Sequence, residues 1–81
     1  MRIKREEGCV KVWASASDTF EWAHRPMNAW PCSQLSGKRL FAEFWDGDLV
    51  DYTVNGKSGI DLDATEFNAF IEDALGSVNP Q

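Results

Sequence analysis

The chain has 81 residues, of which 43% are hydrophobic and 12% aromatic, and its formal net charge at pH 7 is −5. A chain of this length forms one domain, and its hydrophobic content excludes an intrinsically disordered protein. No run of about 18 apolar residues is present, which excludes a membrane-spanning helix. The charged start, MRIKREEG, lacks the apolar region of a signal peptide, and two cysteines are too few for a disulfide framework. We therefore expect a cytoplasmic protein with free thiols.

The charge is unevenly distributed along the chain. Residues 1–40 hold seven basic and four acidic side chains, whereas residues 41–81 hold one basic and nine acidic side chains, a balance of −8. An acidic half attracts a partner with a basic surface and repels nucleic acid. The sequence therefore predicts a protein partner and argues against direct nucleic-acid binding.

Residues 1–14 alternate apolar and polar side chains and predict a hairpin. A four-residue loop at 5–8 would pair Ile3 with Val10 and Met1 with Val12, which gathers the apolar residues on one face. The opposite face would then carry Arg2, Lys4, Cys9, Lys11 and Trp13.

A short helix is predicted next, beginning at Asp18 with Glu21 three residues later and ending before Pro26. The following stretch, RPMNAWPCSQLSGK, contains two prolines and a glycine and predicts an ordered loop with a short turn at 33–36. Trp30 in this loop has two interpretations. It either packs the loop onto the core or is exposed as an anchor for a partner.

The segment FAEFWDGDLVDYTV, residues 41–54, predicts a second hairpin. A two-residue loop at 46–47 would mix carboxylates with core residues, so we expect a three-residue loop, Trp45-Asp46-Gly47, of type I with Gly47 in the left-handed bulge position. One face of this hairpin would then carry Leu40, Ala42, Phe44, Val50, Tyr52 and Val54. The second face would carry Phe41, Glu43, Trp45, Leu49, Asp51 and Thr53.

The segment LDATEFNAFIEDALG predicts a helix over 63–75. Asp63 is the expected N-cap with Glu66 at the third helical position, Leu62 can pack on Phe67, and Gly76 marks the end. The order of elements is ββαββα, which predicts a small α+β domain over residues 1–76 built on an antiparallel sheet. Residues 77–81 are expected to form a flexible tail.

No catalytic, cofactor or metal motif was found. An EF-hand alignment of the NGKSGIDLDATEF region puts Ser58 where glycine is required and Ala64 where glutamate is required. Cys32 and His24 are the only candidates for a Cys-His pair, and no spacing demands that they meet. The sequence predicts no enzyme, no cofactor and no metal site.

The mixture of aromatic and acidic residues on the second face of the sheet has two interpretations. A second helix could cover it as another core layer, or it could dock a partner, with tryptophan and phenylalanine as anchors and carboxylates meeting arginine or lysine. The chain has four tryptophans, more than a core of this size hides. The candidate partner-binding residues are Phe41, Glu43, Trp45, Asp48, Leu49, Asp51, Trp13 and Trp30.

The stretches KVWASASDTFEWAHRP, AWPCS and LSGKRLFAEF resemble short uncharacterised proteins encoded by bacteriophages and prophages, a group that includes anti-CRISPR and other host-inhibiting proteins. The resemblance covers about residues 9–45 and carries no site residues with it. It implies a bacterial cytoplasm and action by stoichiometric binding.

The leading hypothesis is therefore a small acidic binding protein that inhibits a host macromolecule, such as a nucleic-acid-binding defence complex, by protein–protein contact. The alternative is a structural or assembly protein that homodimerises through its aromatic sheet face. A third hypothesis, a nucleic-acid binder using Arg2, Lys4, Lys11 and Trp13, is opposed by the acidic half.

Overall fold

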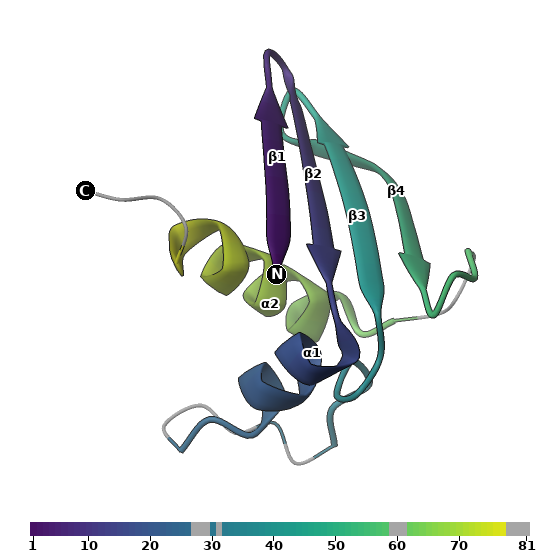
Figure 1. Cartoon of the computed structure of the whole chain (residues 1–81). Helices are drawn as coiled ribbons and strands as arrows, with labels where there is room; N and C mark the ends of the chain where they lie inside the picture. The colour runs from purple at the N-terminus through teal and green to yellow at the C-terminus, as the bar shows by residue number, and fades with distance from the viewer. Residues whose placement is uncertain (27–29, 31, 59–61, 78–81) are drawn as a thin grey trace.

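A computed structural model describes residues 1–26, 30, 32–58 and 62–77. The elements follow the predicted ββαββα order (Figure 1). They are β1 (Arg2–Glu6), β2 (Cys9–Ala14), α1 (Ala16–Ala23), β3 (Leu40–Trp45), β4 (Asp48–Val54) and α2 (Ala64–Ser77). The α+β class predicted from the sequence is confirmed.

The four strands form one antiparallel sheet in the order β1-β2-β3-β4. Both helices lie on one side of this sheet (Figure 1). They both contribute side chains to a single core cluster. The sheet contributes Ala14, Leu40, Ala42 and Val54 to this cluster, and α2 contributes Phe67, Phe70, Ile71 and Ala74. No helix among the described residues has the length and apolar character needed to cross a membrane.

The predicted register of the first hairpin is wrong by two residues. Ile3 lies opposite Val12, not Val10, because β1 and β2 are joined by only Glu7 and Gly8. Since side chains alternate with a period of two, a two-residue shift leaves every side chain on its predicted face. The division of this hairpin into an apolar and a basic face is therefore correct although its loop is not.

The predicted loop of the second hairpin is also wrong. The loop is the two-residue Asp46-Gly47, and both residues have positive φ, 51° and 85°, as a type I′ turn requires. Phe44 therefore pairs with Leu49, and an irregularity follows in which Val50 has no partner and Ala42 again faces Tyr52. This bulge keeps the carboxylates out of the core. The prediction had instead assigned this effect to a longer loop.

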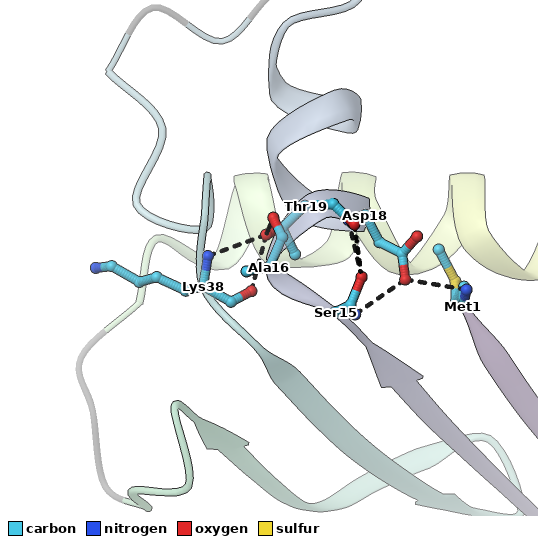
Figure 2. Close-up of polar contacts among 7 residues, drawn as sticks. Met1, Ser15, Ala16, Asp18, Thr19 and Lys38 are labelled. Atoms are coloured by element: carbon cyan, nitrogen blue, oxygen red, sulfur yellow. Dashed lines mark hydrogen bonds and ion pairs between the residues drawn. The ribbon is translucent and has the colours of Figure 1, made fainter.

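Helix α1 begins at Ala16, earlier than predicted. Ser15 is the N-cap and forms a capping box with Asp18, whose backbone N–H donates to Ser15 Oγ while Ser15 N–H donates to Asp18 Oδ2 (Figure 2). Asp18 is therefore the third residue of the helix rather than its cap. The helix ends before Pro26, as predicted.

Helix α2 is capped by Asp63, as predicted, with Thr65 N–H donating to Asp63 Oδ1 at 2.8 Å. The helix continues through Gly76 to Ser77, so Gly76 does not end it. Of the predicted tail 77–81, Ser77 belongs to this helix, and residues 78–81 lie outside the described residues.

Two tryptophans belong to the core and join α1 to the rest of the molecule. The ring of Trp22, 3% exposed, stacks on Trp30 with centroids 5.4 Å apart and meets the edge of Phe70 at 5.2 Å. Its indole N–H donates to Asp73 Oδ2 at 2.8 Å, which satisfies the one polar atom of the buried ring. Of the two interpretations of Trp30, the structure supports packing of the loop onto the core.

The loop before β3 is held by a buried carboxylate. Glu66, 3% exposed on α2, accepts hydrogen bonds from the Ser33 hydroxyl and from the backbone N–H groups of Gln34 and Leu35. The turn predicted at 33–36 is closed only through the Ser33 hydroxyl, which accepts from Ser36 N–H, and the backbone turn lies two residues later, where Lys38 N–H donates to Leu35 O. The predicted capping role of Glu66 is replaced by this contact with the loop.

Candidate protein-binding face

The face of the sheet opposite the helices is not covered by either helix in the part of the chain that the structure describes (Figure 1). We call it the open face. The predicted alternative, a second core layer, is therefore not what this face forms. Its residues are Arg2, Lys4, Glu6, Cys9, Lys11, Trp13, Phe41, Glu43, Trp45, Asp48, Asp51 and Thr53.

The strand register arranges the open face in three rows that cross all four strands. The first row is Arg2, Trp13, Phe41 and Thr53. The second row is Lys4, Lys11, Glu43 and Asp51. The third row is Glu6, Cys9, Trp45 and Asp48. Neighbours in a row have Cβ atoms about 5 Å apart, so the side chains of each row lie within reach of one another.

An aromatic pair occupies the first row. The rings of Trp13 and Phe41 are tilted by 44° with centroids 5.4 Å apart, and the guanidinium of Arg2 lies over the Trp13 ring at 5.1 Å. Both rings are half-buried by their neighbours, while their outer surfaces remain accessible. This cluster is held in place by its own contacts, so a partner would not have to order it.

Trp45 is the most exposed tryptophan among those described, at 48%. Its indole N–H donates to Glu43 Oε2 at 2.5 Å, which joins the third row to the second. This hydrogen bond fixes the orientation of the ring, while about half of the side chain stays exposed. A large, pre-oriented aromatic ring at a surface is typical of an interaction anchor.

The carboxylates on β3 and β4 form no ion pair with any of the described residues. Ion pairs among the described residues join Lys4 to Glu6, Arg25 to Asp73 and the N-terminal ammonium to Asp18, and none includes Glu43, Asp48 or Asp51. Lys11 lies opposite Glu43 without forming an ion pair. Three carboxylates around Trp45 are therefore available to a basic partner.

A groove of about 530 Å³ lies at the end of the open face next to α1. Trp13 and Phe41 line it, together with Arg2 and Arg39, and Asp18 stands at its border. The backbone N–H of Ser15 and then the N-terminal ammonium, 3.0 Å away, hold the pKa of Asp18 below its ordinary value (Figure 2). Asp18 is thus a fixed anion with its own partners.

The structure brings together six of the eight predicted partner-binding residues. Trp13, Phe41, Glu43, Trp45, Asp48 and Asp51 all lie on the open face. Leu49 does not, because the bulge pairs it with Phe44 on the helix-covered side, where it lines a small pocket with Tyr52 and Phe67. Trp30 does not either, since it stacks on Trp22.

The remaining chemical candidates are used in other ways. The ring of His24 stacks on Phe20 at 4.1 Å and its Nδ1 lies 2.9 Å from Phe20 O, so the ring belongs to the C-terminus of α1. Cys32 is exposed and Cys9 is buried. Within residues 1–26, 30, 32–58 and 62–77, no cluster of three or more His, Cys, Asp or Glu side chains could hold a metal ion.

Sequence reasoning did not place Arg39 or the N-terminal ammonium beside the aromatic pair. Arg39 reaches the groove because the turn ending at Lys38 and the first turn of α1 meet, where Thr19 Oγ1 lies 2.8 Å from Lys38 O and accepts from Lys38 N–H (Figure 2). The N-terminal ammonium is held at the groove by its ion pair with Asp18. No local pattern in the sequence predicts the contact between Thr19 and Lys38, which are 19 positions apart.

No family model, curated protein or solved structure matches this chain.

Proposed function

We propose that this protein binds a second protein through the acidic half of the open face and inhibits it by stoichiometric contact. The observation that carries the proposal is the exposed, pre-oriented Trp45 surrounded by Glu43, Asp48 and Asp51, none of which has an ion-pair partner among the described residues. Such an arrangement combines an exposed aromatic anchor, which a partner would desolvate, with electrostatic steering toward a basic surface.

The class of partner follows from the charge. Carboxylates at fixed spacing on a strand pair present negative charge much as phosphates do, and a nucleic-acid-binding protein has a surface built to receive it. With the resemblance to phage-encoded proteins, this favours a host nucleic-acid-binding complex as the target. The inhibitor occupies the surface and no turnover is needed.

The test reverses the charge of the acidic half. A protein with Glu43→Lys, Asp48→Lys and Asp51→Lys is compared with wild type as bait for proteins from a bacterial lysate, and the affinity of the retained protein is then measured with purified components. We expect the retained protein to be lost from the variant, with an affinity at least 100-fold weaker, because three attractive contacts become repulsive.

A matched control separates local charge from net charge. Glu7→Lys, Glu21→Lys and Glu72→Lys change the net charge by the same amount at exposed positions outside the open face. This control should keep the partner. If the variant of the acidic half binds the same protein as tightly as wild type, the proposal is wrong.

A further inference from the structure

The open face has two halves of opposite charge. The half on β1 and β2 carries Arg2, Lys4 and Lys11, with Glu6 at its far end, and the half on β3 and β4 carries Glu43, Asp48 and Asp51. The basic surface that the acidic half attracts is thus present on the same chain. The two halves lie side by side on one sheet, so they can meet face to face only in two copies.

From this pattern we infer that the open face also binds a second copy of the chain, in a two-fold dimer whose axis runs roughly parallel to the strands. Such an axis places β1 opposite β4 and β2 opposite β3 of the second copy and keeps each row opposite itself. Lys4 then faces Asp51 of the second copy, and Lys11 faces Glu43. Each pairing occurs twice by symmetry.

The first row supports the same arrangement. Trp13 faces Phe41 of the second copy, which brings two aromatic pairs together at the interface, and Arg2 faces Thr53. The one opposition of like charges is Glu6 with Asp48, at a corner of the face, and it subtracts from the attraction of the other charged pairs.

The other face-to-face arrangement is disfavoured by charge. A two-fold axis perpendicular to the strands places each strand opposite its own copy, so Lys4 and Lys11 face lysines and Glu43 and Asp51 face carboxylates. Like charges in direct opposition are destabilising. The charges of the second row therefore favour the axis parallel to the strands over the axis perpendicular to them.

The size of the face predicts a weak dimer. Four strands about 4.8 Å apart and five residues at about 3.4 Å each give a face on the order of 19 by 17 Å, which is small for a stable interface. Self-association should thus appear at high protein concentration and compete with the proposed host protein for the acidic half. This inference does not depend on the identity of that protein.

The experiment is a charge-exchange cycle read by sedimentation equilibrium at low salt. The proteins are wild type, Lys4→Asp, Asp51→Lys and the double variant carrying both changes. We expect wild type to dimerise, each single change to weaken the dimer at least tenfold, and the double variant to return to within about threefold of wild type. Lys38→Asp, an exposed charge reversal outside the sheet, should leave the dimer unchanged.

The rescue is specific to the proposed axis. Positions 4 and 51 lie on opposite edge strands, about 14 Å apart within one chain, so the double variant cannot be rescued by an internal contact. Asp51→Lys also lowers the net negative charge, so a general charge effect would strengthen association where the inferred axis predicts weakening.

Two results would overturn the inference. One is a wild-type protein that stays monomeric at every concentration, and the other is a double variant no stronger than the single ones. The dimer needs both halves of the open face, whereas the proposed host protein needs only the acidic half. Changes in the basic half therefore test the dimer without testing the proposed function. A monomeric wild type that still retains a host protein would remove the dimer and leave the proposed function intact.

Discussion

Glu66 is a carboxylate buried between α2 and the loop before β3, and it accepts three hydrogen bonds from that loop. We expect Glu66→Gln to lower the free energy of unfolding by about 2–3 kcal/mol, because the amide loses the charge and turns an N–H₂ group toward a donor. Urea unfolding at 25 °C measures the loss. Glu72→Gln, exposed on the same helix, should change stability by less than about 0.5 kcal/mol. Equal effects of the two changes would contradict the role given to Glu66.

Asp18 should make stability depend on pH in the acid range. Its pKa in the folded protein lies below the ordinary value of 3.8, so its contribution is complete above 3.8 and is lost as the pH falls through the lower, folded pKa. We expect Asp18→Asn to lower stability at pH 6 and to flatten the dependence of the melting temperature on pH below about 4. If the melting temperatures of wild type and Asp18→Asn change with pH in parallel, Asp18 does not contribute to the pH dependence of stability.

At the scale of single residues, the sequence predicted local roles such as helix capping better than contacts with distant residues. The capping signature was correct for Asp63, but Glu66, expected at the same cap, faces a loop more than 30 positions away. Likewise, Trp22 and Trp45 are both tryptophans in amphipathic segments. Trp22 is buried because it packs against Trp30 and Phe70, whereas Trp45 lies on the open face and is exposed.

At the scale of the elements, the two hairpins show which part of a sheet is predictable. Alternation of apolar and polar residues predicted the faces of the first hairpin, and those of the second as far as the bulge, because a shift of two residues does not exchange them. Loop length was mispredicted in both hairpins. In the second, the bulge at Val50 compensates for the short loop, and compensation of this kind leaves no local signal. Leu49 was therefore assigned to the wrong side of the sheet.

The backbone conformation at Gly47 in the second hairpin and the end of α2 at Gly76 can be tested by replacing each glycine with alanine. Gly47 has φ of +85°, so Gly47→Ala should destabilise the protein by about 1 kcal/mol. Gly76 lies in α2 with open space around it, so Gly76→Ala should stabilise it by up to about 1 kcal/mol. Thermal unfolding of both variants checks the pair. Opposite signs are expected, and destabilisation by both would mean that α2 does not extend to residue 77.

At the scale of the whole molecule, the fold class follows from the order of elements, but which face is open does not. A ββαββα chain can place its helices on either face of the sheet, and the decision here comes from the short link between Ala14 and α1 and from the loop that Glu66 holds. The candidate site was therefore predictable as a set of residues, with Leu49 and Trp30 as exceptions. The arrangement of these residues in three rows could not be predicted, because it depends on the register of the strands.

The edges of the sheet differ from its open face. The outer strand β1 carries Arg2, Lys4 and Arg5, and the other outer strand, β4, is interrupted by the unpaired Val50. Charged side chains and bulges on outer strands prevent another chain from adding to the hydrogen-bond ladder. The sheet is thus closed to growth by strand addition. A protein with an exposed aromatic surface can in this way remain in finite complexes and avoid forming fibrils.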